Sequence, residues 1–164
     1  MDRPIMLRHT VPMLRRLARS LGHRPWFAKV ARGLVPADRF LGKITKGRVV
    51  ALGLLPSMII TTTGRKSGQP RTQPLIFMRD GDGFVVIGSN WGQPGHPSWS
   101  TNLLADPEAE IKVNGDTIPV RGRLATGTER DRLWTIATSV WPAYDTYQAR
   151  TGGRQIRVFR LERR

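Results

Sequence analysis

Short segments rich in apolar residues, with apolar and polar residues in alternation at 117–124, predict β-strands in the last two thirds of the chain. Six segments carry the pattern, and they cover residues 58–63, 72–79, 84–89, 110–113, 117–124 and 156–161. Two short turns join strand pairs: Asp80-Gly81-Asp82-Gly83, and Asn114-Gly115, which is a strong hairpin signal. The order of strands and turns therefore predicts antiparallel pairing between neighbours.

Apolar residues at helical spacing predict a few helices beside these strands. Residues 98–105 form a short one that Asp106-Pro107 stops, and residues 126–140 form a longer one. Thr126 and Glu129 have the spacing of a capping box at the start of the longer helix, and Pro142 ends it. Few helices around six strands favour a mainly β fold with α: a small antiparallel barrel with peripheral helices.

The N-terminal part of the chain has a different character. Residues 11–21 predict a basic amphipathic helix, and residues 38–46 predict a second helix. The first 48 residues contribute +10 of the net charge of +15. We therefore expect a basic N-terminal extension at 1–37 and one domain at 38–164, a division that fits a chain of 164 residues.

The amino-acid composition indicates in which cell compartment the protein works and which partners it binds. The chain has no cysteine, which excludes disulfides and thiolate chemistry, and it has no apolar run of eighteen residues. We expect a cytoplasmic protein whose 1–37 extension can dock on an anionic membrane surface at the inner face of the membrane. The charge alone would also permit nucleic-acid binding, but no recognised motif supports it.

A basic turn is the strongest candidate for chemistry. The sequence TTTGRKSG at 61–68, with Arg71 just beyond it, places cations and backbone amide groups where a strand ends. The spacing is neither that of a Walker loop nor that of a dinucleotide-binding glycine motif. His9, His23 and His96 are far apart in the sequence, so no metal site is predicted. The turn predicts an anion site.

Aromatic residues gather downstream of this turn. They lie in the loops at 89–92 and 96–99 and in the run WPAYDTY at 141–147. Together with the basic turn, they are able to hold an aromatic ring with an anionic tail. Core and surface roles also remain open for these residues, above all for Trp134.

The segment TTTGRKSGQPRTQPLIFMRDGDGFVVIGSNWGQPGHPSWSTNLLADP, with the later WPAYDTYQARTGGRQIRVFRLE, resembles the deazaflavin-dependent nitroreductase family of split β-barrel oxidoreductases. The resemblance covers about residues 38–162. It implies an FMN-binding-like split β-barrel and reduced coenzyme F420 as the hydride donor, with FMN disfavoured. The hydride would leave ring carbon C5 for a small hydrophobic acceptor such as a quinone, a nitroaromatic or an activated alkene.

The resemblance also implies a site. The coenzyme's anionic tail would bind at Arg65, Lys66, Ser67 and Arg71. Its ring would lie against Pro74, Ile87, Ser89, Asn90 and Trp91, with Trp99 and Asn102 closing the pocket. The candidates for catalysis are Tyr144, Tyr147 and Ser89, because a phenol is able to donate a hydrogen bond or a proton to the acceptor's oxygen.

Two departures from the characterised nitroreductase bear on the acceptor. This chain has Asn90 where that enzyme has lysine, and Trp141 where it has tyrosine.

The alternative function is a membrane-associated split-barrel protein that binds a lipid or fatty acid without reductase activity. A homodimer also fits, since dimers are usual among split barrels.

Overall fold

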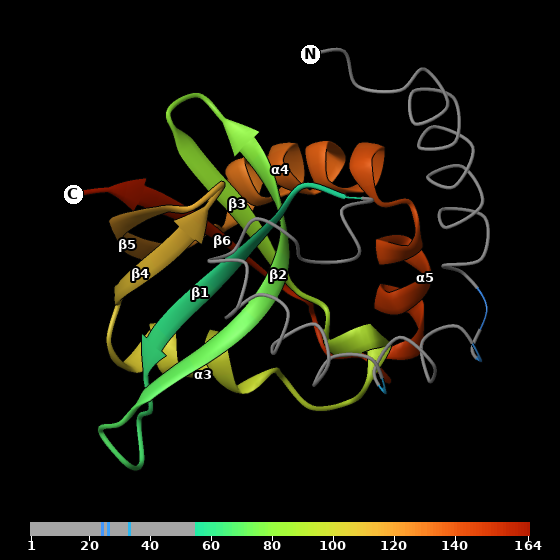
Figure 1. The fold of residues 1–164 in the computed structure, drawn as a ribbon. Helices are drawn as coiled ribbons and strands as arrows, with labels where there is room; N and C mark the ends of the chain where they lie inside the picture. Colours follow the sequence, from blue (N-terminus) through green and yellow to red (C-terminus); the bar gives the residue numbers. More distant parts are fainter. Residues whose placement is uncertain (1–23, 25, 27–32, 34–54) are drawn as a thin grey trace, which may run out of the picture.

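The computed structural model describes Arg24, Trp26, Gly33 and residues 55–164. The helices predicted at 11–21 and 38–46, and the division between 1–37 and 38–164, fall on segments outside the described residues. Six antiparallel strands form a closed barrel in the order β1-β2-β3-β6-β5-β4 (Figure 1). The predicted mainly β architecture with peripheral helices is confirmed.

All six predicted strands are present, with ends that differ by a few residues. Their bounds are β1 Ser57–Thr63, β2 Pro70–Asp80, β3 Gly83–Gly88, β4 Glu108–Val113, β5 Asp116–Leu124 and β6 Arg157–Arg163. The turn between β4 and β5 has Asn114 at φ 55° and Gly115 at φ 98°, the two positive angles that a tight hairpin turn requires. Both predicted hairpin turns are confirmed.

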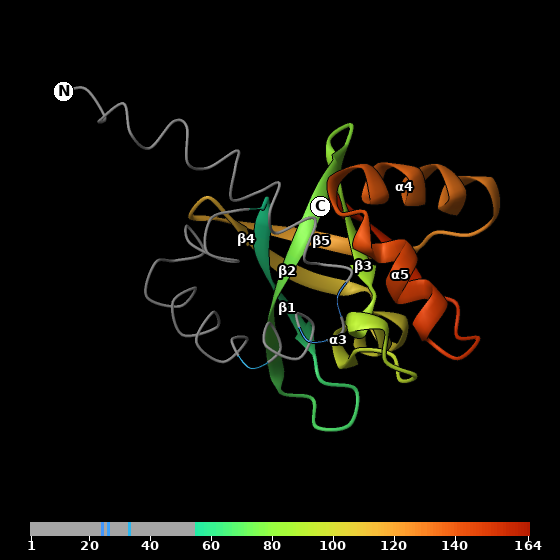
Figure 2. The ribbon, with the colours of Figure 1, turned by 90° about the vertical axis from the view of Figure 1, so that its right-hand side faces the viewer.

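Within residues 55–164, three helices and one short 3-10 turn accompany the barrel. They are η2 Asn90–Gly92, α3 Ser98–Ala105, α4 Gly127–Val140 and α5 Ala143–Arg150. Figures 1 and 2 show α4 and α5 together on one side of the barrel, while α3 lies at the end reached by the β1–β2 turn. Within the described residues, no helix is both long and apolar enough to cross a membrane.

The start of α4 differs from the sequence prediction. Thr126 is the N-cap residue, but its side chain makes no capping hydrogen bond, so the predicted capping box is wrong. Arg123 of β5 binds both carboxylate oxygens of Glu129, at 2.6 and 2.8 Å. A bidentate, charge-assisted pair is stronger than a bond to a backbone amide, and it turns Glu129 away from the helix end.

Strand β3 separates two apolar cores. Phe84 and Val86 are buried inside the barrel, and Val85 and Ile87 are buried against α4 and α5. Since successive side chains of a strand point to opposite faces, the run FVVI serves both cores at once. This second core fixes α5, and with it Tyr144 and Tyr147, against the barrel.

Asp80, in the turn between β2 and β3, is bound by two arginines from other elements. Arg132 of α4 donates two hydrogen bonds to its carboxylate, at 2.6 and 2.9 Å, and Arg160 of β6 adds a third at 3.2 Å. The Arg132 hydrogen bonds are the main cause that lowers the pKa of Asp80. The carboxylate thus ties the β2–β3 turn to α4 and to β6.

Candidate functional site

β2 and β3 are neighbours in the closed barrel, but they pair along only part of their length. These strands pair from Phe77 opposite Val86 to Asp80 opposite Gly83, and the pairing recorded between them ends there. Residues 70–76 of β2 pair with β1, whereas β3 pairs with β6 as far as Gly88. If the β2–β3 register continued, Pro74 would face Ser89, but proline has no amide hydrogen for a ladder. Among the described residues, β3 therefore does not pair with the part of β2 that contains Pro74, and this part is called the open edge of β2 below.

The basic turn connects β1 to β2 at one end of this edge. Gly64 is needed for close packing, since a Cβ there would lie 2.8 Å from Ser67 Oγ and 3.0 Å from the Gln69 carbonyl oxygen. The amides of Ser67 and Gly68 donate to the Gly64 carbonyl, and that of Gln69 donates to Ser67 Oγ. These amides serve the turn itself, so an anion would depend on side-chain cations.

Three such cations project from the turn and the start of β2. Arg65, Lys66 and Arg71 are all exposed, and none of them forms an ion pair within the described part of the chain. Arg71 is held by a 3.3 Å hydrogen bond to Ser67 Oγ. Guanidinium and ammonium groups without carboxylate partners suit phosphate and carboxylate ligands, so the donor set fits the tail of coenzyme F420.

Asn102 fixes the turn from the side of α3. Its side-chain amide donates to Thr62 Oγ1 at 3.0 Å, and its side-chain oxygen accepts from the Arg65 backbone amide at 3.2 Å. The side chain is buried, and its partners are about 40 positions away along the chain. In this structure Asn102 therefore positions the basic turn. Its neighbour Trp99 is buried in the barrel core, 5.7 Å from the Phe159 ring.

The loop after β3 has an unusual backbone. Asn90, Trp91 and Gly92 all have positive φ angles, of 47°, 57° and 76°. Asn90 closes the loop by donating from its side chain to the Gly95 carbonyl oxygen at 2.8 Å. Positive φ is unfavourable for a residue with a side chain, so other contacts must hold this conformation.

Arg154 provides those contacts. It donates to the carbonyl oxygens of Gly88, Ser89 and Gln93 at distances between 2.8 and 3.2 Å, and to His96 Nδ1 at 3.2 Å. Burial is the main cause that lowers the pKa of Arg154. Its guanidinium group spans both ends of the loop at 88–93 and holds them together.

The position of Arg154 is itself fixed by α5. Gln148 donates to the Arg154 carbonyl oxygen at 2.8 Å and accepts from the Ile156 amide at 2.8 Å. The buried Thr151 hydroxyl donates to the same Arg154 carbonyl at 2.7 Å. These bonds fold the chain between α5 and β6 into a rigid turn.

Tyr144 and Tyr147 lie in the core between α5 and the barrel. Their exposed fractions are 4% and 1%, and the Tyr147 ring is 6.1 Å from Trp91 of the loop. Burial raises the pKa of both phenols, while a hydrogen bond with the Trp141 indole and the charge of Arg150 oppose part of the rise at Tyr147. Both side chains stay neutral at ordinary pH and keep a hydroxyl hydrogen to donate. Contact with an acceptor would require neighbouring groups to move aside.

Comparison with known proteins shows to which family this chain belongs. Residues 39–163 match the model of the F420H(2)-dependent quinone reductase family. The chain belongs to this family. The family is defined by its use of reduced F420, so the protein is an oxidoreductase with coenzyme F420 as its cofactor.

Individual relatives agree with the family match. An F420H(2)-dependent quinone reductase of Mycobacterium tuberculosis (strain H37Rv) is 39% identical over 115 residues, which are 68% of this chain and 76% of that protein. The solved structure of an F420-H2 dependent reductase is 35% identical, with a TM-score of 0.60 over 65% of this chain and 94% of that chain. A structure described as a domain-swapped dimer is 34% identical, with a TM-score of 0.63 over 77% of this chain and 94% of that chain. The predicted split barrel is confirmed.

The structure distributes the sequence-predicted residues over one connected region. Arg65, Lys66, Ser67 and Arg71 form the basic turn, Pro74 lies on the open edge of β2, and Ser89, Asn90 and Trp91 form the loop that would face this edge. Ile87 points into the core beneath α4 and α5. The roles of these residues toward coenzyme and acceptor stay predictions. Sequence reasoning missed Arg154, although the two glycines before it signalled a tight turn at this place.

Proposed function

We propose that this protein reduces a quinone-type acceptor, with the F420 ring beside the open edge of β2 and the coenzyme's anionic tail on the basic turn. When bound, reduced F420 supplies the hydride. The supporting observation is that three cations, which have no carboxylate partner among the described residues, lie next to the part of β2 that β3 does not pair with in the described structure. This juxtaposition suits a flat ring that continues into an anionic chain.

The residues around the site would act by binding and orientation. Arg65, Lys66 and Arg71 neutralise the tail, and Asn102 keeps their turn in place. The loop at 88–93 presents Ser89 and Trp91 toward the ring, while Arg154 holds its backbone. Tyr144 or Tyr147 donates a hydrogen bond to the acceptor oxygen as negative charge develops there. No ionised phenol is needed for that role.

Binding of oxidised F420, followed by quenching of tryptophan fluorescence, tests the coenzyme site. We expect saturable quenching at micromolar F420 and none with FMN in parallel. Lys66→Gln and Arg71→Gln should each weaken F420 binding by about 3- to 10-fold, because each removes one charge-assisted contact. Arg121→Gln is the matched control, since Arg121 is an exposed strand arginine with only a 3.6 Å ion pair to Glu108. Equal affinities in all four proteins would remove the basic turn from the coenzyme site.

The acceptor requires a separate comparison. Steady-state oxidation of F420H2 with a menaquinone analogue and with a nitroimidazole would rank the two classes. We expect the quinone to be the better acceptor, because Asn90 replaces the lysine of the nitroreductase and is already engaged with Gly95. A higher kcat/KM for the nitroimidazole would reverse this assignment.

Two further proposals concern partners. The basic segment 1–37 docks the protein peripherally on an anionic membrane, so a variant that lacks residues 1–36 should lose binding to anionic vesicles and keep its affinity for F420. Unchanged vesicle binding would rule out this role.

The chain forms a homodimer, which is supported by the domain-swapped relative and is testable by sedimentation.

A further inference from the structure

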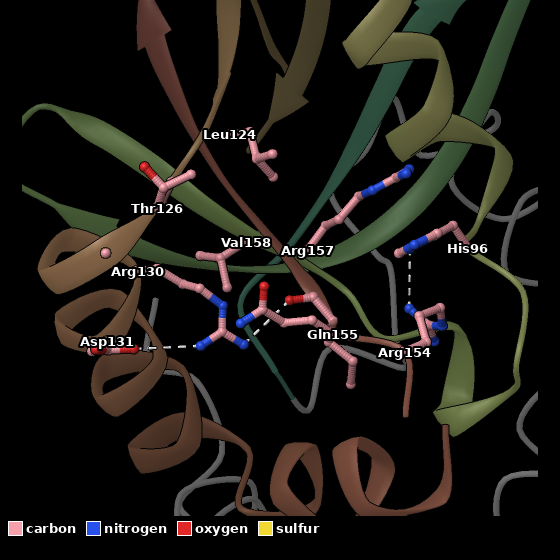
Figure 3. Close-up of a pocket in the computed structure, with 12 residues that line it drawn as sticks. His96, Leu124, Thr126, Arg130, Asp131, Arg154, Gln155, Arg157 and Val158 are labelled. Atoms are coloured by element: carbon pink, nitrogen blue, oxygen red, sulfur yellow. Dashed lines mark hydrogen bonds and ion pairs between the residues drawn. The ribbon is translucent and has the colours of Figure 1, made fainter. Parts of the chain in front are cut away.

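A pocket of about 560 Å³ lies beside β5, β6 and the start of α4 (Figure 3). Its wall consists of the β5–α4 junction, the start of α4, residues 154–158 and His96. Leu124 and Val158 give it an apolar surface. The volume is in the range of small-molecule sites.

Helix α3 lies between this pocket and the basic turn. Arg157 of the pocket contacts the hydroxyls of Ser100 and Thr101 on α3, whereas Asn102, the next residue of the helix, binds the turn. In the barrel order, β5 and β6 of the pocket lie opposite the β1–β2 hairpin. The pocket is therefore separate from the three cations of the basic turn.

The pocket carries uncompensated positive charge. Arg154 and Arg157 are half-buried, and neither forms an ion pair within the described residues, where they contact carbonyls, hydroxyls and the His96 ring. Asp131 is the acidic residue in the wall, but its side chain is 77% exposed and lies 3.5 Å from Arg130. An anionic ligand would offset this positive charge.

Several donors remain for such an anion. Within the described residues, Arg157 makes two long contacts, at 3.3 and 3.4 Å, both through Nη1. His96 Nδ1 must accept from Arg154, so its hydrogen is on Nε2, which is left to donate. The N–H groups of Arg154 already donate to the loop, so Arg154 contributes only its positive charge to the binding of an anion.

The N-terminus of α4 adds a favourable dipole. The helix has 14 residues, and its N-cap Thr126 and first residue Gly127 both line the pocket. Since Thr126 makes no side-chain cap, the first amides keep their capacity to bind an anion. Figure 3 shows Arg157 and His96 on the side of the pocket away from this helix end, and a guanidinium group beside an imidazole N–H suits a doubly charged group with several acceptor oxygens.

From these contacts we infer that the pocket binds a small organic phosphate monoester. Its phosphate group lies near Arg157 and His96, and its apolar part lies against Leu124 and Val158. This inference does not depend on the coenzyme site.

The test measures the change in Tm of the full-length protein with inorganic phosphate and with phenyl phosphate, at an ionic strength kept constant with sodium chloride. We expect a saturable rise in Tm, with the tighter apparent Kd for phenyl phosphate, because its ring gains the apolar wall. Arg157→Gln should weaken this Kd by about tenfold. The double variant Lys66→Gln/Arg71→Gln, which removes the other anion site, should retain the part of the response that Arg157→Gln loses, and Arg121→Gln should respond as the wild type does.

Each outcome has one meaning. A response that survives in Arg157→Gln but disappears in Lys66→Gln/Arg71→Gln would overturn the inference and place the anion on the basic turn. An equal effect of chloride, or weaker binding of phenyl phosphate than of inorganic phosphate, would also overturn it. If Arg157→Gln does not fold, Arg130→Gln measured by titration calorimetry replaces it, and an unchanged Kd there counts against the site. Loss of F420 binding with an intact phosphate response would refute the coenzyme proposal alone.

Discussion

Replacing Arg154 by methionine should release the loop that is proposed to face the coenzyme ring. Arg154 makes four hydrogen bonds to the carbonyl oxygens of Gly88, Ser89 and Gln93. Methionine fills much of the same volume but donates none of these bonds. The loop would then keep its positive φ angles at Asn90 and Trp91 without the contacts that hold them.

The size of the effect follows from those contacts. Hydrogen bonds from a charged donor contribute about 1.5–3 kcal/mol each, and the cost of burying the guanidinium group offsets part of their sum. We therefore expect the free energy of unfolding to fall by about 2–4 kcal/mol. Arg154→Lys should recover less than half of the loss, because a single ammonium group cannot reach both ends of the loop.

Two measurements check this expectation. Urea unfolding followed by circular dichroism gives the stability, and tryptophan quenching by F420 gives the coenzyme affinity, which should weaken by about tenfold. Asp80→Asn is the control for general destabilisation, since Asp80 binds Arg132 and Arg160 on α4 and β6, outside the loop. An Arg154→Met protein with wild-type F420 affinity would refute the idea that Arg154 organises the site, whatever its stability.

Three other expectations follow from the same structure. Gly92→Ala should destabilise the protein by about 3 kcal/mol, because φ is +76° and the new Cβ would lie 2.9 Å from the Tyr147 carbonyl oxygen, whereas Gly95→Ala, with open space around it, should be neutral in urea unfolding. Asp80→Asn should cost about 1–2 kcal/mol at pH 7. Because Arg132 lowers the pKa of Asp80, the stability that this carboxylate provides is present above its unfolded pKa and is lost as the pH falls through its folded pKa. The unfolding curves of wild type and Asp80→Asn should therefore converge in acid, and a constant gap from pH 7 to pH 2 would contradict this link.

Local sequence patterns were enough to predict most of the barrel. Short apolar segments and the alternation at 117–124 predicted the six strands, and Asn114-Gly115 predicted a hairpin whose positive φ angles the structure confirms. Helix α3 was predicted at its observed bounds. These features depend on neighbours within a few positions, which a single sequence contains.

Helix α5 was missed for a physical reason. Its sequence begins after Trp141-Pro142 and has an apolar face of only three buried residues, Ala143, Tyr144 and Tyr147. Their burial depends on α4 and on the outer face of β3, which no local pattern shows. The capping box failed in a similar way, since Glu129 found a distant guanidinium group instead of its own helix end.

The candidate site could be recognised by residue type but not by how it is held. The basic turn and the loop at 88–93 each carry the chemistry that the sequence suggested, yet each depends on one polar side chain from another part of the chain. Asn102 reaches back about 40 positions to Thr62, and Arg154 reaches back more than 60 to Gly88 and Ser89. Both anchors bind backbone or hydroxyl groups, so substitutions at the anchors should change coenzyme affinity even if neither side chain touches the coenzyme. Loss of affinity after such a substitution therefore does not by itself identify a ligand contact, and the stability of each variant has to be measured beside its Kd.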